Sequence, residues 1–132
     1  MTDGEPRDRA LQILYEAERR GFEEPDLGLL TGKAARIVHG VTEHLADIDA
    51  TLNRLSAHWR TDRMPVVDLT VLRMGVYELL WEDTPPGVVL SEAARLASAY
   101  STEKSAPFVN GVLSAVAAER EPGSRNRGTA DS

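Results

Sequence analysis

The apolar positions of this chain recur three and four residues apart over most of its length, which is the spacing of one face of an α-helix. The pattern predicts five helices, at about residues 6–20, 32–57, 65–81, 88–100 and 105–120. No alternation of apolar and polar residues persists along the chain, so no strand is expected. The sequence therefore predicts an all-α protein with short connections between antiparallel neighbours.

Local signals support the ends of the first helix. Pro6 suits a helix start, and Gly21 suits a left-handed helix stop. The second helix is the longest, and its apolar residues form a narrow seam. This seam consists of Ala34, Val38, Val41, Leu45, Ile48, Leu52 and Leu55. It fits the core of a bundle, and a coiled-coil dimer is the alternative. The predicted core comprises Leu45, Ile48, Leu52, Leu72, Val76, Leu79, Val109, Val112 and Leu113.

The last helical segment contains Asn110 and Gly111, a pair that also fits a two-residue hairpin turn. Its flanks favour a helix, because Ser105 can cap one, Pro107 is tolerated in the first turn, and small helix-forming residues follow. Inside a helix a glycine costs about 1 kcal/mol relative to alanine. Gly111 is therefore either simply tolerated or required for the close approach of another backbone, a partner or a ligand, and the sequence leaves both open.

With 132 residues, the chain is long enough for one domain, expected at residues 1–120. Apart from Pro122, residues 121–132 contain no apolar side chain larger than that of Ala130, and we expect them to form a disordered tail. The chain has no cysteine, which excludes disulfides and thiolate zinc sites. No apolar run approaches the roughly 20 residues of a membrane span, and the N-terminus does not resemble a secretory signal. We therefore expect a cytoplasmic protein without membrane contact.

The formal net charge is −6, from 15 basic and 21 acidic residues, so any contact with nucleic acid is expected to be local and shared with a partner. Of the three histidines, His39 and His44 are five residues apart, whereas a helical zinc pair has a spacing of four. We expect no metal site and no cofactor. No phosphate-binding glycine loop, serine elbow or carboxylate pair stands out, so an enzyme is not expected.

Four segments together carry a resemblance to a known family. They are RALQILYEA at residues 9–17, LRMGVYELL at 72–80, VLSEAA at 89–94 and TEKSAPFVNGVL at 102–113. The chain resembles the NusB family of bacterial transcription antitermination factors, over about residues 7–118. The resemblance implies a bundle of two packed helical halves, with residues 7–20 and 32–57 in the first half and the helices from Pro65 onward in the second.

The resemblance also implies a function. NusB proteins bind boxA-type leader RNA together with NusE, a protein of the small ribosomal subunit, and support rRNA transcription in the elongation complex by binding alone. Carried onto this sequence, the implied RNA contacts are Arg7, Arg9, Gln12, Tyr15, Phe108 and Asn110. The implied partner contacts are Tyr15 and Glu78. Tyr15 and Phe108 also suit packing against the core. Glu78 is expected to be exposed, because it lies on a helix face away from Leu72 and Leu79.

The chain departs from the family pattern in its binding residues. The family's arginine-rich N-terminal arm is reduced here, because Asp3, Glu5 and Asp8 outnumber Arg7 and Arg9. This change predicts weak RNA binding without a partner. Arg95 stands where the family commonly has glutamate, which suggests an altered binding surface.

Two alternatives follow from these departures. One is a divergent interaction module that dimerises or sequesters NusE and binds little RNA. The other is the RNA-guiding domain of an rRNA cytosine methyltransferase, which would require a longer chain.

Overall fold

The computed structural model describes residues 5–22, 32–56 and 60–119. These residues form six α-helices and one 3-10 turn, and none of them forms a strand. In chain order the elements are α1 (Pro6–Arg19), α2 (Gly32–Glu43), α3 (Leu45–Leu55), η2 (Thr61–Arg63), α4 (Val66–Trp81), α5 (Pro86–Tyr100) and α6 (Ser105–Glu119). The all-α prediction is confirmed. Asp3, His58 and the predicted tail at 121–132 lie outside the described residues.

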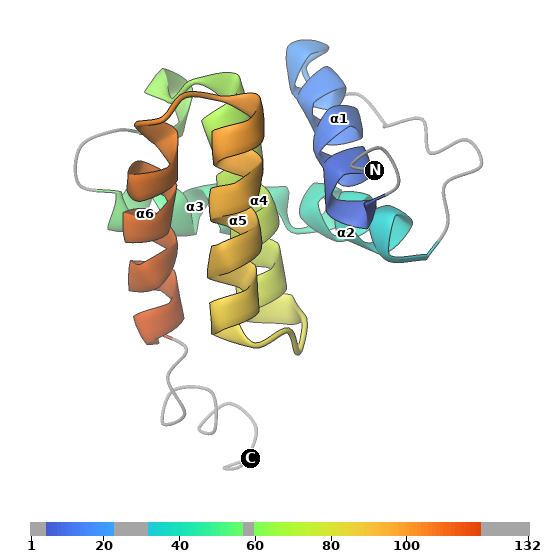
Figure 1. The fold of residues 1–132 in the computed structure, drawn as a ribbon. Coiled ribbons are helices and arrows are strands. Elements are labelled where there is room, and N and C mark those ends of the chain that lie inside the picture. The colour runs from blue at the N-terminus through green and yellow to red at the C-terminus, as the bar shows by residue number, and fades with distance from the viewer. Residues whose placement is uncertain (1–4, 23–31, 57–59, 120–132) are drawn as a thin grey trace.

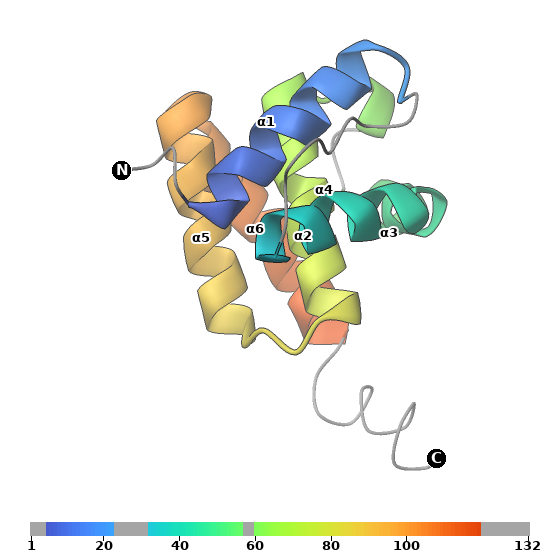
Figure 2. The same cartoon turned by 90° about the vertical axis from the view of Figure 1, so that its right-hand side faces the viewer.

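Helix α4 is the centre of the molecule, because it contacts each of the other five α-helices. Helix α5 runs antiparallel to both α4 and α6, and α1 packs against α2 and α4 (Figure 1). The division into two helical halves is confirmed. Helix α3 continues from α2 and lies against α4 and α6, so it spans from the first half to the second (Figure 2).

The burial of α4 extends around its whole circumference, since every residue from Asp68 to Leu79 is buried. The sequence VVDLTVLRMGVYELL is apolar enough for such a position, as expected of a helix that has neighbours on all sides. Its buried polar residues are Asp68, Thr70, Arg73 and Glu78. Buried polar groups require hydrogen-bond partners, so these residues determine which side chains the surrounding helices must supply.

The prediction of one long helix at residues 32–57 is wrong, because the helix breaks at His44. The backbone there has φ −105° and ψ 19°, and the imidazole stacks on Trp81 with ring centroids 4.1 Å apart. The backbone hydrogen bonds continue across this residue, from the His44 N–H to the Gly40 carbonyl and from the Ile48 N–H to the His44 carbonyl. The break is therefore a kink, and it lets α3 lie on α4 and α6. Leu45, at the kink, is only half-buried, contrary to its predicted burial.

The other predicted helix ends and core residues agree closely with the structure. Gly21 ends α1 in a left-handed conformation with φ 76°, and the Phe22 N–H bonds to the Ala17 carbonyl. Asn110 and Gly111 lie inside α6, which confirms the helical interpretation over the hairpin. The confirmed core residues are Ile48, Leu52, Leu72, Val76, Leu79, Val109, Val112 and Leu113. Among the described helices, none has the length and apolar character required to cross a membrane.

Candidate functional site

The outward face of α1 carries polar side chains that a ligand can reach. Arg9 and Gln12 are exposed and lie three residues apart, so they share a helix face. Tyr15 is half-buried, and the guanidinium of Arg19 lies 5.9 Å from the centre of its ring. Neither Arg9 nor Gln12 forms a side-chain hydrogen bond or an ion pair with the rest of the described chain. Guanidinium, amide and phenol groups on one helix face are suited to bind phosphates and bases.

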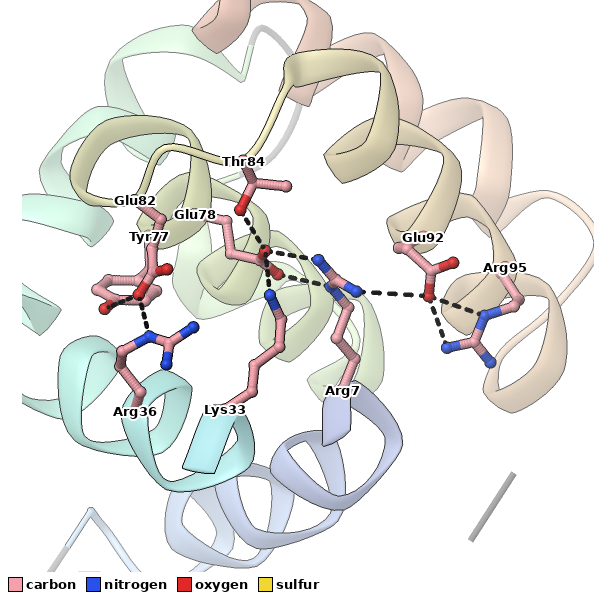
Figure 3. A network of polar contacts seen from close by, with 9 residues as sticks. All are labelled: Arg7, Lys33, Arg36, Tyr77, Glu78, Glu82, Thr84, Glu92 and Arg95. Carbon is pink, nitrogen blue, oxygen red and sulfur yellow. Dashed lines mark hydrogen bonds and ion pairs between the residues drawn. The ribbon is translucent and has the colours of Figure 1, made fainter. Parts of the chain in front are cut away.

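Arg7 lies in the first turn of the same helix but points toward the protein interior. Its Nε donates to Glu78 Oε2 and its Nη2 donates to Glu78 Oε1, each at 2.8 Å (Figure 3). A third nitrogen, Nη1, lies 3.9 Å from Glu92. The hydrogen bond to Glu78 is the main reason that the pKa of Arg7 is raised above its ordinary value. The guanidinium of Arg7 therefore already holds α1 against α4.

Glu78 is buried, with 2% of its surface exposed, so the predicted exposure of this residue is wrong. Besides Arg7, its Oε1 lies 3.9 Å from Lys33 Nζ and accepts a hydrogen bond from the Thr84 hydroxyl at 3.3 Å (Figure 3). The physical reason is that α4 is surrounded by helices, so that even the face away from Leu72 and Leu79 is covered. The predicted contact between Glu78 and a protein partner stays a prediction.

Asp8 does not contribute to an acidic arm, because its carboxylate is completely buried. Arg95 donates to it through Nη2 at 2.8 Å and through Nη1 at 3.3 Å, and the Tyr100 hydroxyl donates at 2.7 Å. Burial raises the pKa of Asp8, but the hydrogen bonds from Arg95 and Tyr100 outweigh burial and hold the pKa below its ordinary value. Arg95 thus turns toward Asp8 and Glu92, and a third of its side chain, 33%, stays exposed. Of the acidic arm residues, Glu5 is exposed.

The second predicted RNA-binding segment lies on α6. Phe108 is half-buried against the hydrophobic core, whereas Asn110 and Gly111 are exposed. A methyl group at Gly111 would have no neighbour within 4 Å, so no packing in the described chain requires glycine there. Helices α4 and α5 lie between α1 and α6 (Figure 1). The structure therefore does not bring Phe108 and Asn110 together with the candidates on α1.

The sequence interpretation missed the partners of buried Arg73. This guanidinium bonds both oxygens of Asp49, at 2.9 and 2.8 Å, and one oxygen of Glu18 at 2.6 Å. Asp49 therefore takes part in a cluster within the fold and is not purely solvated. The available signal was the arginine itself, because a charge in a largely apolar central helix needs carboxylate partners. This cluster connects α1, α3 and α4, and its role is structural.

Near the end of α4, the Tyr77 hydroxyl donates to Glu82 at 2.5 Å, and Arg36 donates to the same oxygen at 2.9 Å (Figure 3). Burial and then the bond to Glu82 raise the pKa of Tyr77 well above its ordinary value. Within the described ranges, no three histidine or acidic side chains are grouped as metal ligands would be. His39 lies 3.7 Å from Glu43, and both side chains are exposed.

Together, the fold and the exposed face of α1 define an all-α domain with accessible guanidinium and amide groups on an outer helix. The family model described as the NusB family matches residues 4–118. The chain belongs to the NusB family, and its curated relatives are transcription antitermination proteins.

Among the relatives, the chain is 44% identical over 124 residues to the transcription antitermination protein NusB of Acidothermus cellulolyticus, with 86% of each chain covered. It is 46% identical to the NusB of Thermobifida fusca, with 82% of this chain and 83% of the relative covered. Both alignments span most of the two proteins, so the likeness covers the domain as a whole.

Solved structures agree with this assignment. A structure of T. maritima NusB matches with a TM-score of 0.79 and 34% identity, covering 92% of this chain and 94% of the other. A structure of antitermination factors NusB and NusE in complex with dsRNA matches with a TM-score of 0.73 and 31% identity, covering 86% and 93%.

Proposed function

We propose that this protein is a transcription antitermination factor that binds boxA-type leader RNA together with ribosomal protein NusE. It supports rRNA transcription within the elongation complex, in the cytoplasm, and it acts by binding and not by catalysis. Family membership and the names of the relatives support this function. The observation that carries it in this chain is the outward face of α1, where Arg9 and Gln12 are exposed beside Tyr15.

The six proposed RNA contacts differ in what they offer an RNA. Arg9 is exposed and carries a full charge for a phosphate, while Gln12 and Tyr15 offer hydrogen-bonding and stacking groups. Arg7 contributes less to phosphate binding, because Glu78 already neutralises its charge. A neutralised arginine displaces fewer of the counterions condensed on the RNA, and the release of these counterions is what favours binding. Phe108 and Asn110 provide a second contact on α6. NusE is proposed to bind near Tyr15 and Glu78.

The test is the affinity of the purified protein for boxA RNA, measured with and without purified NusE over a salt series. A shuffled RNA of the same length is the control. We expect weak binding by the protein alone, tighter binding with NusE, and a preference for boxA over the shuffled RNA. NusE binding with no contribution from RNA would favour the divergent interaction module instead. Sedimentation of the same samples shows whether a homodimer forms.

A further inference from the structure

Three residues far apart in the sequence form a clamp between α1 and α5. We call Asp8, Arg95 and Tyr100 the Asp8 clamp. The carboxylate of Asp8 is completely buried and accepts two hydrogen bonds from Arg95 and one from Tyr100. A guanidinium that binds a carboxylate through two nitrogens fixes the direction of the contact as well as its distance. The clamp therefore limits rotation of the first turn of α1 about the helix axis.

The position of the clamp links it to both groups of proposed RNA contacts. Asp8 directly precedes Arg9 and lies one helical turn before Gln12. Tyr100 is the last residue of α5, and the short connection after it leads to the start of α6 at Ser105. Phe108 and Asn110 lie in the first two turns of α6. The clamp thus ties the outward face of α1 to the end of the bundle where α6 begins.

We propose that Arg95 and Tyr100 are positioning residues for RNA binding, which act through Asp8 to hold Arg9 and Gln12 in a fixed orientation relative to the start of α6. One RNA strand can then contact both groups, because the clamp already holds α1 in place before the RNA binds. The proposal rests on the proposed function. It also gives a specific role to Arg95, the arginine that stands where the family commonly has glutamate.

The alternative is that the clamp only stabilises the fold. A double-mutant cycle separates the two roles, because residues that act as one unit show effects that do not add. The cycle combines Arg95→Gln with Arg9→Gln, and RNA affinity with NusE present is measured over a salt series. Circular dichroism first establishes a temperature at which every variant is folded. Tyr100→Phe is included because it removes one bond of the clamp without changing the charge.

The matched control is Arg54→Gln. Arg54 donates two hydrogen bonds to Glu119, at 2.6 and 3.1 Å, so the control also breaks a two-nitrogen pair and removes the same charge, at an exposed site between α3 and α6. Arg95→Lys is the conservative variant, because it keeps the charge and loses the two-nitrogen geometry.

The positioning role predicts that Arg95→Gln lowers RNA affinity roughly tenfold, the effect of one lost charge-assisted contact. It also lowers the salt slope by about one unit, as loss of a phosphate contact does. Adding Arg9→Gln to Arg95→Gln changes the affinity by less than about twofold, because the two act as one unit. Tyr100→Phe lowers the RNA affinity in the same direction but more weakly. Arg95→Lys retains part of the affinity that Arg95→Gln loses. Arg54→Gln keeps the affinity within about twofold of wild type.

If the wild type binds RNA, two results would overturn the positioning role and leave the proposed function standing. One is losses from Arg95→Gln and Arg9→Gln that simply add. The other is an equal loss from Arg54→Gln, which would assign the effect to net charge. If the wild-type protein with NusE shows no RNA binding at all, the proposed function fails and the positioning role fails with it. The wild-type measurement therefore distinguishes the two failures.

Discussion

Helices α1 and α6, the two that are proposed to meet RNA, use their polar side chains in different ways. The first turn of α1 is held by two arginine–carboxylate pairs, Arg7 with Glu78 and Asp8 with Arg95. Helix α6 is held mainly by apolar packing, and Asn110 and Gly111 remain exposed on its surface. Charges near the start of α1 therefore serve mainly the fold, and the exposed part of α6 has little structural constraint.

This difference changes how the reduced arm is interpreted. A count of charges gives two arginines against three acidic residues in the first nine positions. In the structure, Asp8 is neutralised by Arg95 and Arg7 is neutralised by Glu78. Among the described residues of the arm, Arg9 is then the one whose positive charge is available to an RNA. The exposed carboxylate of Glu5 opposes it. Charges at a helix start can be assigned to a ligand only after their partners in the fold are known.

The largest effect is expected where α1 is tied to α4. Glu78→Lys places a third cation beside Arg7 and Lys33 in a buried site, so it should lower the free energy of unfolding by about 3–5 kcal/mol. Urea denaturation measures this change. Exposed Glu103→Lys makes the same charge change and should stay within about 0.5 kcal/mol of wild type. Equal stability of the two variants would contradict the structural role of Glu78.

The Asp8 clamp should appear as a pH-dependent contribution to stability. Because the hydrogen bonds from Arg95 and Tyr100 hold the pKa of Asp8 below its ordinary value in the folded protein, its contribution is complete above about pH 5 and is lost as the pH falls through the folded pKa. At pH 7, Arg95→Gln should cost about 1–3 kcal/mol, since it leaves a buried carboxylate without its main donor.

In the Arg95→Gln variant, burial without the guanidinium raises the pKa of Asp8, so protonation at low pH relieves the penalty. The stability difference between wild type and variant should therefore shrink between pH 5 and pH 3. Denaturation curves at several pH values test this. A difference that stays constant down to pH 3 would show that the carboxylate of Asp8 is not the group responsible.

Two glycines give contrasting effects, and the effect of Gly111 is the smallest on stability. A methyl group at Gly40 would lie 2.2 Å from the Tyr77 ring, so Gly40→Ala should destabilise the protein by about 1–3 kcal/mol. Gly111→Ala meets no neighbour within 4 Å and should stabilise it by about 0.5–1 kcal/mol. Thermal melts compare the two directly. If Gly111→Ala is stabilising yet weakens RNA binding, the glycine serves a ligand, whereas unchanged binding shows that it is merely tolerated.

The helices could be predicted from the sequence because each buries an apolar face with helical spacing. The kink at His44 could not be predicted in this way, since the apolar spacing continues across it and neither proline nor glycine occupies the position. The kink depends on contacts between distant segments, namely the packing of α3 on α4 and α6 and the stacking of His44 on Trp81. Spacing within one helix carries no information about such contacts.

The exposed residues of the candidate site, Arg9 and Gln12, were predicted by family resemblance, and the structure places them on an accessible face. The burial of Glu78 was missed because helical spacing separates two faces of a helix but does not show whether both are covered. The nearly continuous apolar sequence of α4 was the available signal. The pair between Asp8 and Arg95 joins residues 87 positions apart, and no local pattern connects them.

The most direct test of this account compares Arg7→Gln with Arg9→Gln, two substitutions that remove the same charge two residues apart. RNA affinity with NusE present is measured over a salt series on folded protein, together with the free energy of unfolding. We predict that Arg9→Gln lowers the salt slope by about one unit and leaves stability unchanged, whereas Arg7→Gln destabilises the protein and changes the slope much less. Equal losses of slope without any loss of stability would contradict the claim that Arg7 serves the fold and Arg9 serves the RNA.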